Sequence, residues 1–432
     1  MENKLLKNVF GLSSSQHKIS KEIIAGLSTF LTMAYILSVN PMILSATGMD
    51  KEALFTTTAV ASFIATFLMA VYAKLPFVLA PGMGLNAFFA FTVCGALGYS
   101  WQFALTAVLV EGIIVIILSL TGIREKIVHL LPKVLRDSIG IGIGLYIAFI
   151  GLQKAEIIIN NDATLVGLGN LSSPSILLAC IGIIITGILL IRKITGALLL
   201  GIIITTIIGI PMGITHIESI FSMPPSIEPI FCKFELDKIL STDMLIVLST
   251  FLFVDLFGTM GTLIGVANQA NMIREDGTMH HMNRAFLVDA IGTTAGSILG
   301  TSTVTTFIES ATGISAGGRT GLTAFTSAMC FLVALFFAPL FLAIPTAATA
   351  PVLFIVGLMM ISSITEIDIK DYSVSLPAFV CIIMTPLTYS IADGIILGML
   401  SYILINLFTS RRKEITWATI LLGLVFALKY II

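Results

Sequence analysis

Charged residues and cysteines are scarce in this sequence, and each shortage narrows the class of protein. Only 11% of the 432 residues are charged, and the net charge of −1 points to no particular partner. The five cysteines lie far apart without a CxxC pair, which indicates neither a disulfide framework nor a metal centre. A GxxxxGK[ST] phosphate loop is absent, which argues against ATP as an energy source. We expect no metal, no cofactor and no nucleic-acid partner.

Apolar residues dominate instead, at 57% of the chain, and the mean hydropathy is +1.05. A transmembrane helix needs about 20 mostly apolar residues, and such runs recur from end to end. The sequence therefore predicts an all-α polytopic membrane protein in contact with lipid, with about 14 spans. The predicted spans are 24–44, 53–73, 77–98, 102–121, 136–152, 174–191, 196–213, 244–267, 285–300, 304–316, 321–343, 349–364, 375–409 and 415–432. The long run 375–409 fits two short crossings or one bent element.

The ends and loops of the chain indicate its orientation. Residues 1–23 carry four lysines without the short apolar core of a cleavable signal, so we expect a retained tail. Alternating the loops from a cytoplasmic N-terminus places most Lys and Arg on the cytoplasmic side, as the positive-inside rule requires. We expect a multi-pass protein of the cell membrane with its N-terminus in the cytoplasm.

Two stretches inside predicted spans are unsuited to continuous helix. The first, Ala80-Pro-Gly-Met-Gly-Leu-Asn-Ala87, holds helix-breaking residues. The second, Thr301-Ser-Thr-Val-Thr-Thr-Phe-Ile-Glu-Ser310, is rich in β-branched residues and contains the acid Glu309. Non-helical backbone at membrane depth is tolerated only where protein or a cavity surrounds it. The two stretches therefore predict a binding site, in which free helix N–H groups and strand pairing across the halves satisfy the backbone.

An internal repeat relates the two stretches. Leu27-Ser-Thr-Phe-Leu31 recurs as Leu248-Ser-Thr-Phe-Leu252, and Ile194-Thr-Gly-Ala197 is echoed by Ile415-Thr-Trp-Ala418, both at an offset of 221 residues. The same offset aligns Asn86 with Phe307, inside the two unusual stretches. Paired interrupted segments in two halves are a sequence sign of a transporter's substrate site. Because each half holds seven spans, an odd number, the repeats must be inverted.

Acidic residues within predicted spans are functional candidates, because a charge at membrane depth is costly. Asp255 lies midway along the span 244–267, and Glu309 follows the β-branched run. For Glu111, Asp289 and Asp393 we favour structural roles; the last two lie near predicted span ends, where helix capping is available. The glycine-rich turn Gly313–Gly321 favours close helix packing over anion binding.

The motifs of this chain resemble those of the azaguanine-type hypoxanthine/guanine permeases, within the nucleobase/ascorbate transporter group. The resemblance rests on Ala80–Phe88, Phe253–Ala267 and Gly300–Gly321, and it extends from Ala25 to at least Ser390. It implies two inverted seven-span repeats, a core domain that moves against a gate domain, and short strands in spans 3 and 10. Members carry nucleobases, commonly with protons.

On that resemblance the chain divides into four parts. Residues 1–23 form the cytoplasmic tail, 24–213 the first repeat, 214–243 an extracellular connector and 244–432 the second repeat. The core would comprise spans 1–4 and 8–11, and the gate spans 5–7 and 12–14.

The resemblance also implies the site residues. Glu309 matches the family's acid in span 10, and Asn86 matches its polar residue in span 3. Span 8 departs from the family pattern Asp-x-Phe-Asp-Thr, because Gly258 replaces the second acid while Asp255 is kept. The candidate substrate-binding residues are Glu309, Asn86, Asp255, Ser310, Gly258 and Phe253, and the candidates for proton coupling are Glu309 and Asp255.

The predicted function is import of a purine nucleobase, hypoxanthine, guanine or adenine, by proton symport. An anion or small-solute transporter or channel on the same fold is the alternative, although it would want a basic residue where Glu309 stands. An intramembrane enzyme is disfavoured, since no Ser/His/Asp set is found in the spans. The base carried and the existence of a homodimer are left open.

Overall fold

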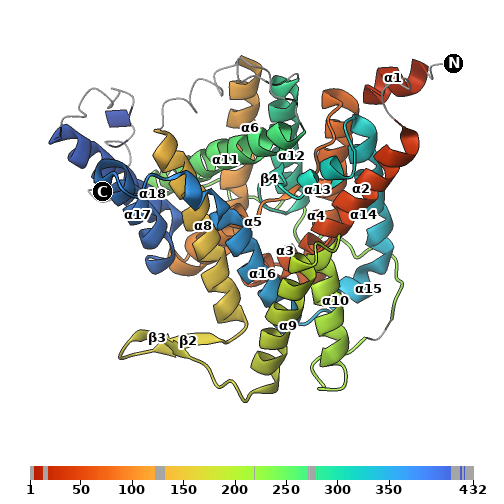
Figure 1. Cartoon of the computed structure of the whole chain (residues 1–432), viewed down its shortest axis with the longest axis horizontal. Coiled ribbons are helices and arrows are strands. Elements are labelled where there is room, and N and C mark those ends of the chain that lie inside the picture. Colours follow the sequence, from red (N-terminus) through yellow and green to blue (C-terminus); the bar gives the residue numbers. More distant parts are fainter. Residues whose placement is uncertain are drawn as a thin grey trace.

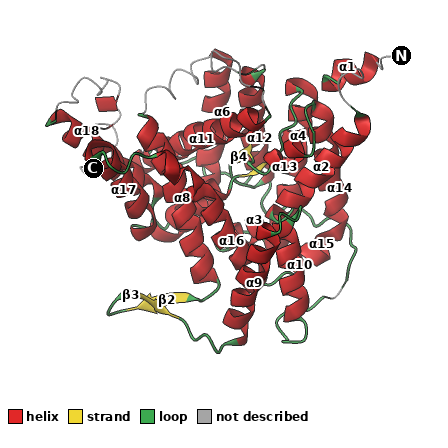
Figure 2. Ribbon diagram, viewed as in Figure 1, coloured by secondary structure: helices red, strands yellow, loops and turns green. Residues whose placement is uncertain are grey.

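A computed structural model describes residues 4–12, 18–121, 132–217, 219–270, 272, 279, 281–409, 419–420 and 423. Figure 1 and Figure 2 show a helical molecule with two small two-stranded sheets. In these residues eight helical segments are long and apolar enough to cross a membrane, and four more apolar helices are shorter. The multi-pass membrane prediction is therefore confirmed.

The elements have the following bounds. The helices of the first half are α1 (Lys4–Phe10), α2 (Ile19–Met33), α3 (Ile36–Ser45), α4 (Lys51–Leu68), η1 (Met69–Ala73), α5 (Met83–Ala87), η2 (Phe88–Ala96), α6 (Trp101–Thr121), α8 (Lys133–Lys154), α9 (Pro174–Ile191) and α10 (Ala197–Gly209). Those of the second half are α11 (Thr242–Gln269), α12 (Met282–Leu299), α13 (Ser310–Ser315), α14 (Gly321–Ala334), η3 (Leu335–Phe337), α15 (Ala338–Leu342), α16 (Thr346–Met360), η4 (Ile361–Glu366), α17 (Tyr372–Leu387) and α18 (Ile391–Leu407). The strands are β1 (Leu79–Pro81), β2 (Ile158–Asn161), β3 (Leu165–Leu168) and β4 (Val304–Thr306).

The two stretches unsuited to helix form strands that pair with each other. β1 and β4 are antiparallel, with Leu79 opposite Thr306 and Pro81 opposite Val304. All of their residues except Thr305 are buried, and the pairing satisfies backbone groups that lipid would leave without partners. The predicted strands in spans 3 and 10 are thus confirmed. Each strand runs into a short helix, α5 or α13.

The longer helices pack in two groups around this strand pair. In the first, α4 contacts α3, α12 and α14, while α6 contacts α11 and α12. In the second, α8 contacts α16, α17 and α18, while α9 contacts α10 and α16. Figure 1 shows α17 and α18 at the left and α2, α4 and α14 at the right. Contacts of α5 and α11 with α8 join the two groups beside the strands.

Several predicted spans differ in detail from the observed helices. The first span begins at Ile19 and breaks at Ala34 and Tyr35, between α2 and α3. The run 375–409 forms two packed helices, α17 and α18, separated by the turn Thr388–Ser390. Nearly all of the predicted span 415–432 lies outside the described residues.

Asp289 and Asp393, which we predicted to lie near span ends, differ in their positions along their helices. Asp289 lies in the middle of α12 and is fully buried, so its predicted place near a span end is wrong. Asp393 lies in the first turn of α18, where its backbone N–H is capped by the Ser390 hydroxyl, so its predicted place near a helix end is confirmed.

The glycine-rich turn after α13 allows neighbouring helices to approach closely, as predicted. A Cβ on Gly318 would lie 2.6 Å from the Thr323 hydroxyl, and one on Gly321 would lie 2.1 Å from the Ala70 carbonyl oxygen. The Arg319 guanidinium donates to the carbonyls of Ile314 and Gly318. Glu22 accepts hydrogen bonds from the backbone N–H of Arg319 and Thr320, and so fastens α2 to the start of α14.

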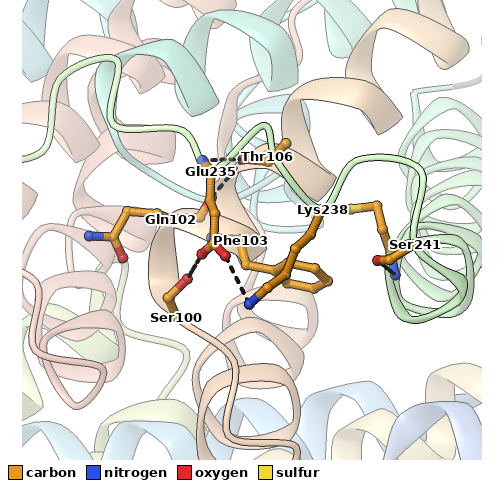
Figure 3. Close-up of polar contacts among 8 residues, drawn as sticks. Ser100, Gln102, Phe103, Thr106, Glu235, Lys238 and Ser241 are labelled. Carbon is orange, nitrogen blue, oxygen red and sulfur yellow. Dashed lines mark hydrogen bonds and ion pairs between the residues drawn. The ribbon is translucent and has the colours of Figure 1, made fainter.

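The connector between the two halves is fastened to the start of α6 (Figure 3). Glu235 accepts a hydrogen bond from the Ser100 hydroxyl and pairs with Lys238 at 3.0 Å, while its backbone N–H donates to Thr106 Oγ1 at 2.9 Å. The hydrogen bond from Ser100 and the pairing with Lys238 hold the pKa of the Glu235 carboxyl below its usual value. The connector therefore rests on α6 through a carboxylate that is ionised at neutral pH.

Candidate functional site

Glu309 lies between β4 and α13, directly before the first residue of the helix. Its side chain makes no capping hydrogen bond to its own helix. Instead, Oε1 accepts a hydrogen bond of 2.6 Å from the hydroxyl of Tyr35, which stands in the break between α2 and α3. Glu309 is 5% exposed, and its neighbour Ile308 is 41% exposed. The carboxylate therefore lies just beneath an accessible surface, at the end of non-helical backbone.

Asn86 occupies the matching place in the first half, in α5 after β1. Its Oδ1 accepts a hydrogen bond from Ser302, which precedes β4. The Asn86 side chain is fully buried, and its Nδ2 has no hydrogen-bond partner among the described residues. A buried amide nitrogen without a partner is unusual in a folded protein. Asn86 thus offers a donor that a bound ligand could use.

Ser310 follows Glu309 and is also buried, but its hydroxyl has a backbone partner. Its Oγ accepts a hydrogen bond of 3.0 Å from the N–H of Val78, just before β1. The hydroxyl therefore holds the two unusual stretches together. Whether it also contacts a ligand stays a prediction.

The three candidates on α11 occupy different environments. Asp255 is buried and accepts a hydrogen bond of 2.9 Å from Thr259, one turn further along its own helix. Gly258 is exposed, and a Cβ placed there would have no atom within 4 Å. Phe253 is partly buried and packs against the main hydrophobic core. α11 contacts β4, α5 and α13, so these residues belong to a helix beside the strand pair.

Sequence reasoning missed the hydroxyl groups that hold the two candidate side chains. Tyr35 binds Glu309, Ser302 binds Asn86, and Thr303 donates to Glu111 on α6 at 2.9 Å. The last contact gives Glu111 a structural partner, as we favoured from the sequence. A polar aromatic residue in an apolar span, six residues before Pro41, was the signal that could have marked Tyr35.

The packing of the aromatic rings near the strand pair separates structural rings from a candidate for substrate binding. Phe88 and Phe89 on η2 are buried and contact Phe251 on α11, with ring centroids 4.8 and 6.4 Å apart. These two rings therefore pack helix against helix. Phe253 stays the aromatic candidate of the site.

Comparison with solved structures identifies the fold. The chain is similar to the transmembrane domain of a cyanobacterial bicarbonate transporter, BicA, at a TM-score of 0.67 and 19% identity, over 88% of this chain and 96% of that one. The structure of SLC26A9 gives a TM-score of 0.63 at 12% identity, over 94% of this chain and 69% of the other. At such identities the likeness concerns the fold alone.

Comparison with sequences identifies the family. Residues 20–397 match the model of the Permease family (Xan_ur_permease). A Methanocaldococcus jannaschii permease is 48% identical over 99% of this chain and 98% of its own. The adenine permease AdeQ of Escherichia coli is 39% identical over 100% and 97%, and the guanine/hypoxanthine permease PbuG of Bacillus subtilis is 41% identical over 99% of each chain. The chain therefore belongs to the Permease family, and it is a multi-pass membrane transporter rather than an enzyme.

Proposed function

We propose that the protein is a secondary transporter that imports a purine nucleobase, hypoxanthine, guanine or adenine, together with protons. The observation that carries this proposal is the buried Glu309 carboxylate at the end of the β1–β4 pair, where it meets Tyr35. An acid at membrane depth is expensive to bury and is a functional candidate by default. Paired broken helices are where secondary transporters bind their substrates.

The chemistry of the site suits the edge of a purine. A purine presents N–H donors beside ring nitrogen or carbonyl acceptors, and a carboxylate accepts such N–H groups through charge-assisted hydrogen bonds. Glu309 supplies the carboxylate, and Asn86 supplies a buried amide donor without a partner among the described residues. The relatives named as adenine and as guanine/hypoxanthine permeases support a purine as the substrate class.

Proton coupling requires a group that binds and releases a proton in each cycle. Glu309 and Asp255 are the two buried carboxyls that we assign to this role. Glu309 is the stronger candidate because it lies at the strand end, whereas Asp255 is held by Thr259 on its own helix. The proton would then travel on the group that also holds the base.

Alternating access would move the first helix group against the second. Among the described residues, the first group contains helices of the spans that the family resemblance assigns to the core, and the second contains helices of the spans assigned to the gate. This agreement supports a core that carries β1, β4 and Glu309 past a gate built on α8 and α16. Fourteen spans, two inverted repeats and a cytoplasmic N-terminus complete the proposal.

The test is uptake of radiolabelled hypoxanthine, guanine, adenine, xanthine and uracil into cells that lack their own nucleobase carriers. Wild type should show saturable uptake of at least one purine, and Glu309→Gln should abolish it. Glu228→Gln, an exposed acid of the connector, is the matched control and should transport normally. A protonophore should reduce accumulation by wild type. Uptake of bicarbonate or sulfate without uptake of any base would favour the anion alternative.

A further inference from the structure

The first span contains a break that no Pro or Gly at the break itself explains. α2 ends at Met33, α3 begins at Ile36, and Ala34 and Tyr35 lie between them. Pro41 follows within α3 and cannot donate a backbone hydrogen bond to the carbonyl of Leu37. The break puts the Tyr35 side chain against Glu309, although the two residues are 274 positions apart in the sequence.

Tyr35 combines two environments in one side chain. Its ring is fully buried in the main hydrophobic cluster, so the direction of the ring is fixed by packing. Its hydroxyl donates to Glu309 Oε1 at 2.6 Å, a short distance typical of a charge-assisted hydrogen bond. A glutamate carboxylate, at the end of three side-chain torsions, samples many directions in water. A fixed donor on one oxygen removes most of that freedom.

We propose that Tyr35 is a positioning residue of the substrate site. Its hydroxyl holds Glu309 Oε1, so that Oε2 faces the N–H edge of the bound base in one direction. This inference rests on the proposed function, since it concerns the same carboxylate. Tyr35 acts through Glu309 and need not touch the base itself.

The energetic reason is preorganisation. A site that is ordered before binding does not spend binding free energy on ordering its own side chains. Without the hydroxyl, the Glu309 carboxylate would be free to rotate about its side-chain torsions, because the first N–H groups of α13 already donate to backbone carbonyls and offer it no capping partner. Bases that present an N–H to the carboxylate would then bind more weakly. Analogues that lack this N–H would lose little binding affinity.

The test compares Tyr35→Phe with wild type in saturable purine uptake. Phenylalanine keeps the buried ring and removes only the hydroxyl, so the change isolates the hydrogen bond. We expect KM to rise about tenfold, the effect of losing one charge-assisted hydrogen bond, while Vmax per molecule at the membrane changes by less than about twofold. Tyr402→Phe removes the hydroxyl of another buried tyrosine, in α18, and controls for general loss of a hydroxyl.

Competition separates positioning from a structural role. Unlabelled purines and their N-methylated analogues, each blocked at one N–H, compete with the labelled substrate. In wild type, methylation at the N–H that Glu309 accepts should weaken competition strongly; in Tyr35→Phe this difference should shrink about tenfold. A folding defect would lower uptake without changing this ratio, so the ratio reports the geometry of Glu309.

The outcomes distinguish the two proposals. Saturable uptake by wild type with an unchanged KM and an unchanged methylation penalty in Tyr35→Phe would overturn the role of Tyr35 and leave the proposed function intact. A raised KM with a reduced penalty would establish it. No uptake of any purine by wild type would refute the proposed function, and the role of Tyr35 would fall with it.

Discussion

The Thr92 hydroxyl donates a hydrogen bond of 3.0 Å to the backbone carbonyl of Tyr389. This contact joins η2, which packs on α3 and α6 of the first helix group, to the α17–α18 turn of the second. Tyr146 on α8 donates to the same carbonyl at 3.2 Å, and the Tyr389 hydroxyl donates to Gln153. Tyr389 has a φ of 57°, in the left-handed region. If the two groups move during transport, the bond from Thr92 must break in each cycle.

Thr92→Val should therefore speed the exchange of labelled base. A neutral hydrogen bond contributes about 1 kcal/mol, so its loss should raise the exchange rate by up to about fivefold. Thr186→Val is the control, since Thr186 is buried but bonds within its own helix, α9. Exchange by Thr92→Val at or below the wild-type rate would show that this contact does not limit the motion.

Gly258→Asp should change the choice among purines. Nothing lies within 4 Å of a Cβ at Gly258, so the new side chain has room. The added carboxylate offers a second acceptor and should favour guanine, which has more N–H donors than hypoxanthine, by roughly tenfold in relative uptake. Gly258→Asn has the same shape without the charge, and it should favour guanine less. Equal preferences in all three proteins would place Gly258 outside the site.

Gly321→Ala should destabilise the protein, because its Cβ would lie 2.1 Å from the Ala70 carbonyl oxygen. Overpacking of this kind costs about 1–3 kcal/mol. Gly187→Ala on α9 has nothing within 4 Å and should be neutral or stabilising by up to about 1 kcal/mol. Thermal unfolding of the purified variants in detergent measures both. A Gly321→Ala protein as stable as wild type would contradict the close packing of α14 on η1.

The attachment of the connector to α6 should become less stable in acid, because the pKa of Glu235 is lowered in the folded protein. A lowered carboxyl pKa adds stability above the unfolded value of 4.5, and this stability is lost as the pH falls through the folded value. The effect should be small, since the carboxylate is near the surface. The difference in Tm between wild type and Glu235→Gln should shrink below about pH 4.5. A difference in Tm that is constant with pH would show that the ion pair and hydrogen bond of the ionised Glu235 do not stabilise the folded protein.

The sequence predicts the two strands beside the candidate site, but not the side-chain contacts that hold the candidate residues. Pro81 with Gly82 and the β-branched run before Glu309 mark both strands, because helix is costly at these residues. The repeat offset of 221 is a few residues shorter than the separation of β1 and β4. Local patterns could not show that Tyr35 meets Glu309 or that Ser302 meets Asn86, since those contacts depend on how distant helices pack.

The most direct measurement uses the purified chain alone in liposomes loaded with an unlabelled purine. Entry of labelled adenine, guanine or hypoxanthine in exchange for that purine would show that this chain carries the base without another protein. The account predicts saturable exchange by wild type, driven to accumulation by an inward proton gradient, and none by Glu309→Gln. Purine exchange by Glu309→Gln at the wild-type rate would contradict the central role of Glu309 at the end of the strand pair.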